Sequence, residues 1–253
     1  MLYKYVGAQS GEESLKLLQS FCERYMLKAS EPSTLNDPFE LKIAINFEAD
    51  EETMRDRFFQ DRKDTSEEAY KNWRHHHTEQ SQWWIKQETR KELLSRFGVF
   101  CVAAAEDNFL MWSHYGKNHT GFCVGFDESQ LTGINGLLSS DFVKYSEKVP
   151  LFRFYLDPPD LFGRLVFGSK SKCRAYEHEY RFVFDHSGLV KFPRSALKEI
   201  ILGCRAHYQL RTYAHANCDR DEVRFFQMCE DFQEYRLDKQ IVVRDTWPMS
   251  SFF

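Results

Sequence analysis

The sequence of 253 residues predicts an α+β fold, with a mixed, mostly antiparallel (split) sheet and a polar helical insertion packed against it. Strand-like segments dominate from residue 98 onward, and polar helical sequence fills the region from 51 to 97. Strands and helices do not alternate regularly, which disfavours a doubly wound parallel sheet. The sequence contains no glycine-rich Rossmann or P-loop motif. We expect a single domain, 1–253, with the insertion at about 51–97.

The first forty residues predict a strand and then two helix starts. Residues 2–6, LYKYV, alternate as a strand does, and apolar residues recur at helical spacing in 14–27. In STLNDPFE, Asp37 can cap a helix and Glu40 can complete its capping box. Asn36 is interpreted as a turn residue.

The region from 51 to 97 predicts two or more helices, ending where Gly98 offers a left-handed cap. His75, His76 and His77 follow one another on a helix, where neighbouring side chains point about 100° apart. They cannot converge on one metal ion, so we expect them on a solvated face. Basic and acidic residues are nearly balanced here, which disfavours a nucleic-acid-binding stripe.

From Gly98 onward, short apolar runs predict the strands of the sheet. They are GVFCVAAA, GFCVGFD, DFVKYS, YEHEYRFVF, KEIILG and VRFFQM, with helical signals at 161–167 and 207–217. The terminal TWPMSSFF is apolar enough to dock on another surface.

Bulk composition indicates a well-packed protein. Hydrophobic residues make up 42% of the chain and aromatic residues 16%, enough for a sizeable core. The net charge of -4, with both signs interspersed, gives no signature of duplex nucleic acid or membrane as a partner. Seven cysteines, an odd set without a CxxC pair, are read as reduced, buried thiols. With no apolar run long enough to span a membrane, we expect a soluble, cytoplasmic protein.

The segment AYEHEYRFVF, 175–184, separates two kinds of side chain if it is a strand. One face carries Tyr176, His178, Tyr180, Phe182 and Phe184, and the other carries Glu177, Glu179, Arg181 and Val183. The two carboxylates would lie ~7 Å apart. In a cleft, burial and repulsion would raise the pKa of one Glu while Arg181 lowers that of its neighbour. The alternative is a solvent-facing strand whose charges pair with the next strand.

The stretch LMWSHYGKNHTGFCVGF, 110–126, contains a group of polar and aromatic residues that is followed directly by an apolar, strand-like run. A short helix would bury Met111, Trp112 and Tyr115 while Ser113 and His114 face elsewhere. His114 and His119 lack zinc-site spacing, and no GxSxG motif supports a serine hydrolase. We therefore expect no metal. What remains is contact with a bound ligand, or structural roles for these histidines.

Several blocks in order resemble a known family. LYKY, NDPFE, GVFCVAA, LMWSHYGKNHTGFCVGFD, YEHEYR and EIILG are similar to an uncharacterised, mainly bacterial family known as domain of unknown function 2971. This resemblance spans nearly the whole chain and implies no activity. The family commonly has a tryptophan shortly before the YExEYR block, where this chain has CRAYE.

The order of polar residues more distantly resembles ADP-ribosyltransferases, which have a split-sheet fold, a basic first-strand residue and a late catalytic Glu. Lys4 between Tyr3 and Tyr5, Ser113, and Glu177 with Glu179 stand in that order. The resemblance implies NAD as substrate, with Glu179 stabilising the cationic ribose and Glu177 orienting or deprotonating the acceptor. The residues it implies for binding NAD are Tyr3, Lys4, Tyr5, Trp112, Ser113, His114, His119 and Arg181.

Three functions stay open at this point. The first is an ADP-ribosyltransferase-like enzyme that uses a small-molecule nucleotide, as a bacterial toxin or phage-defence effector, with its acceptor unknown. The second is a carboxylate-pair hydrolase of a glycosidic or nucleotide bond. The expected separation of ~7 Å between Glu177 and Glu179 lies within the range for hydrolases that invert the configuration of the sugar carbon. The third is a ligand-sensing or interaction module without enzymatic activity.

Overall fold

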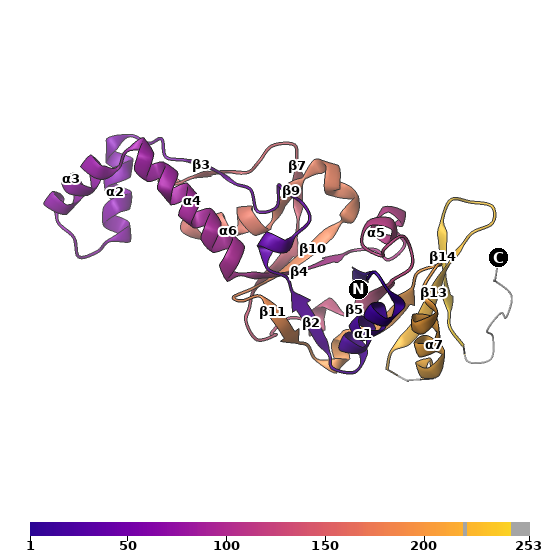
Figure 1. Cartoon of the computed structure of the whole chain (residues 1–253). Coiled ribbons are helices and arrows are strands. Elements are labelled where there is room, and N and C mark those ends of the chain that lie inside the picture. The colour runs from indigo at the N-terminus through magenta and orange to yellow at the C-terminus, as the bar shows by residue number, and fades with distance from the viewer. Residues whose placement is uncertain (220–221, 244–253) are drawn as a thin grey trace.

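The computed structural model describes residues 1–219 and 222–243, so the predicted docking segment TWPMSSFF lies outside the described residues (Figure 1). The strands are β1 (Leu2–Val6), β2 (Met26–Ala29), β3 (Ala44–Asn46), β4 (Gly98–Ala103), β5 (Phe122–Phe126), β6 (Leu137–Phe142), β7 (Lys144–Ser146), β8 (Leu151–Arg153), β9 (Ser169–Ser171), β10 (Glu179–Phe184), β11 (Gly188–Lys191), β12 (Leu197–Leu202), β13 (Arg224–Glu230) and β14 (Leu237–Ile241). The helices are α1 (Gly11–Cys22), α2 (Glu51–Asp61), α3 (Glu67–His76), α4 (Glu79–Arg96), α5 (Phe109–His114), α6 (Pro159–Phe167) and α7 (Tyr208–Asn217), with 3₁₀ turns η1 (Pro32–Thr34), η2 (Glu128–Gln130), η3 (Lys172–Glu177) and η4 (Arg194–Ala196).

Within these residues, the main sheet has eight strands in the order β14-β13-β12-β5-β1-β4-β10-β6. Its described pairings are antiparallel except for that of β12 with β13, which confirms the predicted α+β class with a mixed, mostly antiparallel sheet. β1 and β4 are paired at one position, Tyr3 with Ala103. Beyond it, the side chains of Lys4 and Tyr5 reach β4 and the loop after it, with Lys4 Nζ 2.9 Å from the Cys101 carbonyl and Tyr5 Oη 2.9 Å from that of Ala105. The sheet is therefore split between these strands.

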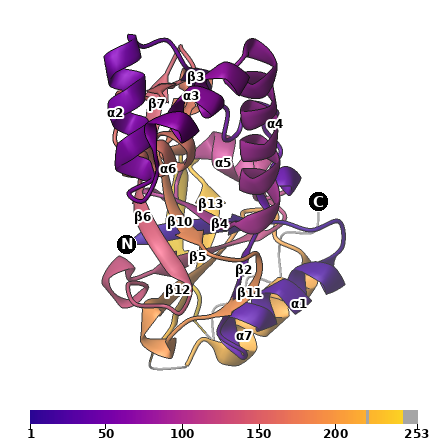
Figure 2. The same cartoon turned by 90° about the vertical axis from the view of Figure 1, so that its left-hand side faces the viewer.

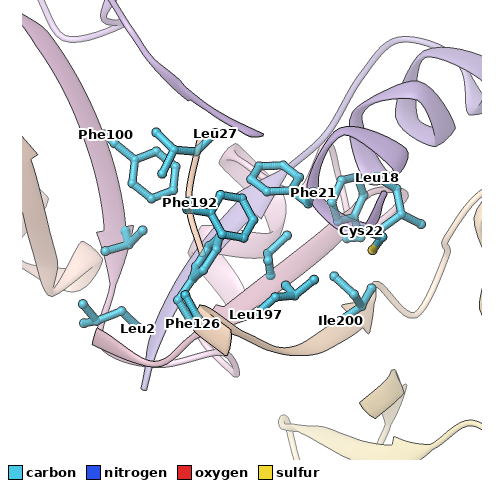
Figure 3. Close-up of a cluster of buried hydrophobic side chains, with 14 of the residues drawn as sticks. Leu2, Leu18, Phe21, Cys22, Leu27, Phe100, Phe126, Phe192, Leu197 and Ile200 are labelled. Atoms are coloured by element: carbon cyan, nitrogen blue, oxygen red, sulfur yellow. The ribbon is translucent and has the colours of Figure 1, made fainter. Parts of the chain in front are cut away.

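One face of the main sheet carries the largest hydrophobic core (Figure 3). Leu18 and Phe21 of α1, with Leu210 of α7, pack there against strand residues such as Phe100 and Phe182. Figure 2 shows α1 and α7 side by side under this face. The alternation predicted for Tyr180, Phe182 and Phe184 is confirmed, since all three lie in this core.

The helical insertion extends away from the main sheet, as Figure 1 shows for α2 and α3. Its aromatic cluster packs on the small β3–β8 sheet through Phe47, Met54 and Tyr155. Leu93 of α4 packs beside Val99 and Val183 of the main sheet, which anchors the insertion.

Three local predictions about caps and faces are wrong. No helix follows Asp37, whose carboxylate instead accepts from the Phe39 N–H at 2.9 Å in a turn. Gly98 begins β4 and is not a left-handed cap, and a Cβ there would lie 2.2 Å from the His186 carbonyl oxygen. His77 is not on a solvated face, because it is buried with Nε2 2.6 Å from the Tyr155 hydroxyl.

The predicted burial of the cysteines holds for part of the set. Cys22 and Cys123 are buried and Cys173 is exposed, while the other four are partly exposed. In the part of the chain that the structure describes, no helix is long and apolar enough to cross a membrane.

Candidate active site

The backbone before β10 brings the two glutamates together. β10 begins at Glu179, so the predicted strand from Tyr176 is wrong in its first part, where the chain forms η3. His178 then adopts a left-handed conformation (φ 42°) and is exposed, so it does not share the aromatic face as predicted. Non-glycine residues rarely take this conformation, and such positions gather at functional sites. Glu177 and Glu179 nevertheless face the same side as predicted, since both carboxylates contact Lys170.

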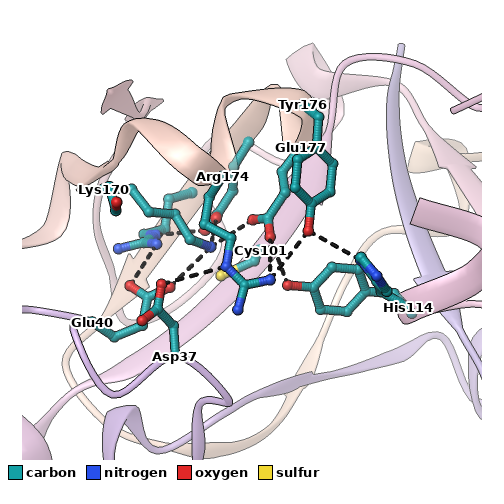
Figure 4. A network of polar contacts seen from close by, with 12 residues as sticks. Asp37, Glu40, Cys101, His114, Lys170, Arg174, Tyr176 and Glu177 are labelled. Carbon is teal, nitrogen blue, oxygen red and sulfur yellow. Dashed lines mark hydrogen bonds and ion pairs between the residues drawn. The ribbon is translucent and has the colours of Figure 1, made fainter. Parts of the chain in front are cut away.

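Lys170 of β9 joins three buried carboxylates (Figure 4). Its Nζ lies 2.6 Å from Glu177 Oε2, 2.5 Å from Glu179 Oε2 and 2.9 Å from Glu40 Oε1. All four side chains are at most 5% exposed. Because Glu177 and Glu179 contact one nitrogen, their facing oxygens are closer than the ~7 Å expected for side chains two residues apart on a strand.

Arg181 is the second buried cation of the site. Its guanidinium lies 2.7 Å from Glu179 Oε1 and 2.9 Å from Glu40 Oε2, and it donates to the Phe167 carbonyl at 3.0 Å. The side chain is 2% exposed. Arg181 therefore holds protein carboxylates in place, whereas the sequence suggested a contact with the nucleotide.

The second oxygen of Glu177 faces a different set of partners. It accepts from the Tyr115 hydroxyl at 2.8 Å, and Arg174 lies 3.5 Å away. Arg174 also approaches Asp37 at 3.6 Å and donates to the Tyr176 hydroxyl at 3.1 Å. Glu177 therefore contacts Tyr115 at the end of α5 directly, and it is linked through Arg174 to Asp37 in the segment before β3.

The environments move the pKa values of the two glutamates in opposite directions. Burial is the largest effect on Glu177 and raises its pKa, although Lys170 opposes it. Burial acts in the same sense on Glu179, but Arg181 and Lys170 together overcome it and hold its pKa well below the usual range. The pKa of Lys170 is raised, since three carboxylates outweigh its burial. The site thus contains one firmly ionised carboxylate beside one that binds a proton more readily.

A cavity of about 90 Å³ lies beside the carboxylates, at the split between β1 and β4. Its walls include Tyr3, Lys4, Tyr5, Asn36, Glu40, Cys101, Tyr115, Lys170, Glu177 and Glu179. Burial raises the pKa of the Cys101 thiol to about 12, so this cysteine is not a ready nucleophile. A cavity of this size holds a few water molecules and is far smaller than a typical small-molecule site of about 300–1,000 Å³.

The residues predicted to bind NAD fall into separate places. Trp112 is fully buried, with its indole N–H 2.7 Å from the Glu106 carbonyl oxygen. His114 is exposed and does not line the cavity, with Nδ1 3.0 Å from the Tyr176 hydroxyl. Ser113 and His119 lie 3.3 Å apart and line a different cavity. The structure therefore brings Tyr3, Lys4 and Tyr5 to the glutamates but does not bring Ser113 or His119 there.

Sequence reasoning missed several residues that shape the site. Local spacing places Glu40 in a capping box, whereas in the structure it pairs with Lys170 and Arg181; the block NDPFE that contains it also carries part of the family resemblance. Lys170 lies in SKSK, a polar run with no periodicity to mark it. The spacing predicts Tyr115 only as part of an apolar helix face, and it does not reveal the hydrogen bond from its hydroxyl to Glu177. The partners of Glu177 and Glu179 come from distant segments, so spacing could not reveal them.

No group of three or more His, Cys, Asp or Glu in 1–219 and 222–243 is arranged to hold a metal ion. The anionic cluster of Glu40, Glu177 and Glu179 is occupied by lysine and arginine instead.

Residues 111–182 match the model of a family described as protein of unknown function (DUF2971). The predicted family resemblance is confirmed over this segment. The match runs from α5 into β10 and includes Tyr115, Lys170, Glu177, Glu179 and Arg181, so much of the charged cluster belongs to the DUF2971 region. Neither a curated protein nor a solved structure matches the chain.

Proposed function

We propose that the protein is an ADP-ribosyltransferase-like enzyme that cleaves the nicotinamide–ribose bond of NAD at the Glu177 and Glu179 carboxylates. One observation carries the proposal: these two buried carboxylates face a cavity beside Tyr3 and Tyr5 of β1 and have pKa values displaced in opposite directions. Two carboxyl groups with divergent pKa values can divide the ionic and proton-transfer roles of a reaction.

Glu179 suits the ionic role. Cleavage sends the bonding electron pair to the nicotinamide ring and leaves positive charge on the ribose, which a fixed anion stabilises. A carboxylate has about four acceptor positions, and the contacts with Arg181 and Lys170 use one on each oxygen. The remaining lone pairs can accept a ribose hydroxyl.

Glu177 suits the proton transfer. The attacking oxygen or nitrogen of the acceptor forms a bond to the ribose carbon, and its proton must pass to a base. Because its pKa is raised, Glu177 binds that proton better than Glu179 does. Tyr115, which donates to Glu177 at 2.8 Å, keeps the carboxylate oriented.

Entry of a dinucleotide requires the cavity to enlarge from about 90 Å³. Ser30, Leu35, Asn36 and Glu40 form one wall, so movement of the segment 30–40 is the simplest opening. Ser30 is fixed to Val99 of β4 by two backbone hydrogen bonds of 2.8 Å, and the rest of the segment is held by contacts that include the Asp37–Arg174 pair and the ion pairs of Glu40.

The decisive experiment combines NAD binding with turnover. NAD should raise the melting temperature of the wild-type protein, and nicotinamide release should be detectable by chromatography. Glu179→Gln should lower that release at least 100-fold, whereas the exposed Glu147→Gln should leave it unchanged. If millimolar NAD neither stabilises the protein nor yields nicotinamide, the proposal is refuted.

A second candidate, a ligand-sensing module without turnover, is favoured by the small cavity and by the ion pairs that Glu177 and Glu179 make with Lys170 and Arg181. It predicts that a small ligand stabilises the fold while no NAD is consumed. The inverting hydrolase has less support, since the oxygens of Glu177 and Glu179 that face Lys170 lie closer together than the ~7 Å on which that alternative depends.

A further inference from the structure

Helix α4 exposes two neighbouring tryptophans, and it runs along one side of the molecule (Figure 2). Trp83 is 52% exposed and Trp84 is 53% exposed, and their rings meet edge to face with centroids 5.6 Å apart. Leu93 is the one buried residue of this 18-residue helix, so most of its surface is left uncovered. Exposed tryptophans are costly in water and are enriched among the residues that dominate binding at protein interfaces.

A shallow groove of about 360 Å³ lies on the same helix, beside the 3₁₀ turn η1. Its walls include Glu31, Ser33, Gln87, Arg90, Lys91 and Leu94. Residues three and four apart lie on the same side of a helix. Trp83, Gln87, Arg90 and Leu94 have this spacing, so the tryptophans and the groove share one side of α4.

The order of these residues makes the surface complementary to itself. Trp83 lies four residues before Gln87, and Lys91 lies four residues after it. Trp84 lies three residues before Gln87, and Arg90 lies three residues after it. When a second copy packs its α4 antiparallel to the first, with a two-fold axis at Gln87, each tryptophan faces a cation of the other copy. A contact of this kind uses the same patch twice and closes as a dimer.

The facing groups attract one another. A guanidinium or ammonium over the face of an indole ring makes a favourable cation–π contact, which strengthens as water is excluded. Lys91 has an ion pair with Glu88 of its own helix at 3.7 Å, and both of these side chains are at least 60% exposed. Arg90 has no ion pair within residues 1–219 and 222–243. Both cations are therefore accessible to a ring from a second copy.

We propose that the protein forms a two-fold dimer through antiparallel α4 helices, in which Trp83 and Trp84 of each copy occupy the groove beside Arg90 and Lys91 of the other. Because a tryptophan buries roughly 150–250 Å² when it is fully covered, the four half-exposed rings supply roughly 400 Å². An interface of this scale gives a weak dimer. Among the described residues, the groove and the cavity at Glu177 and Glu179 share no wall, so the dimer does not depend on the proposed transferase activity.

Sedimentation velocity of the full chain at about 1 to 200 µM tests the dimer. We expect the average mass to rise from one chain toward two, with a dissociation constant of about 10 µM. Replacing both rings, Trp83→Ala with Trp84→Ala, should weaken association at least about tenfold. Thermal melting checks that this variant is folded. The matched control, Phe232→Ala with Tyr235→Ala, removes two fully exposed rings elsewhere and should leave association unchanged.

Cross-linking tests the register in a Cys173→Ser background, because the native Cys173 is exposed. A short bismaleimide should join two copies that carry Gln87→Cys, since this position lies at the axis. It should not join copies that carry Gln80→Cys, because the two copies of that position would be ~21 Å apart along the helices. The proposal is overturned by a chain that stays monomeric, by a dimer that the folded tryptophan variant retains, or by cross-linking that is no stronger at 87 than at 80.

Discussion

Tyr3 and Glu179 lie opposite the same residue, Ala103, from the two strands that flank β4. Residues in register across neighbouring strands project from the same face of a sheet. The first strand of the chain and a strand almost 180 residues later therefore meet at one cavity. On this face the sheet carries charge, while its other face carries the main hydrophobic core.

Lys170 should be essential to the stability of the charged cluster. Lys170→Met leaves three buried carboxylates with less compensating charge, and we expect a loss of about 3–5 kcal/mol in the free energy of unfolding. Lys172→Met removes a nearby lysine that is 65% exposed and should cost less than about 1 kcal/mol. Urea denaturation of both variants measures the difference, and equal losses would contradict a structural role for the buried ammonium.

The two glutamates should affect the pH dependence of stability with opposite signs. The folded-state pKa of Glu179 is depressed, so its contribution is present above the unfolded pKa of about 4.3 and is lost as pH falls through the lower folded value. The folded-state pKa of Glu177 is raised, so its contribution is present below about 4.3 and is lost as pH rises through the folded value.

Glu179→Gln should therefore cost more stability at pH 7 than Glu177→Gln, by about 2 kcal/mol or more. Denaturation at pH 7 and at pH 4 measures both variants. The excess cost of Glu179→Gln should persist at pH 4, where Glu179 is still ionised in the fold. Indistinguishable variants at pH 7 would show that the environments of the two carboxylates are not different.

The segment 30–40 should be held closed in part by Asp37. Asp37→Asn keeps a side-chain oxygen for the Phe39 N–H but removes the charge that faces Arg174 at 3.6 Å. We expect amide hydrogen exchange within 33–40 to accelerate several-fold, with little change elsewhere. Glu31→Gln, at a more exposed carboxylate that contacts Ser33, is the matched control. Unchanged exchange in Asp37→Asn would show that the ion pair does not restrain the segment.

Thiol labelling should distinguish the cysteines by environment. Cys173 is exposed and should react with iodoacetamide at pH 8 within minutes. Cys101 lines the cavity, yet its pKa of about 12 leaves almost no thiolate, and it should remain unmodified on that timescale. Peptide mass spectrometry measures both sites. Labelling of Cys101 as fast as Cys173 would mean that the site is more open and more polar than the structure indicates.

The sequence identified the side chains of the site better than their partners. Alternation in 179–184 separates Phe182 from Arg181 because a strand alternates strictly, and the structure confirms those faces. The same rule failed before Glu179, because a 3₁₀ turn and one left-handed residue replace the strand there. Glu40 was misassigned for a related reason: a capping box and a buried ion pair use the same residue type, and local spacing cannot separate them.

By itself the sequence determined the α+β class, most strands, the apolar face of the sheet and the family resemblance, since these depend on periodicity and composition along short stretches. The tertiary structure alone decided which charges meet. Lys170, Glu40 and Arg181 converge because β9, the segment before β3 and β10 are brought together by the fold. It also decided that His119 lies apart from the glutamates. Such contacts arise between segments far apart in sequence, and their energies depend on a burial that no local pattern encodes.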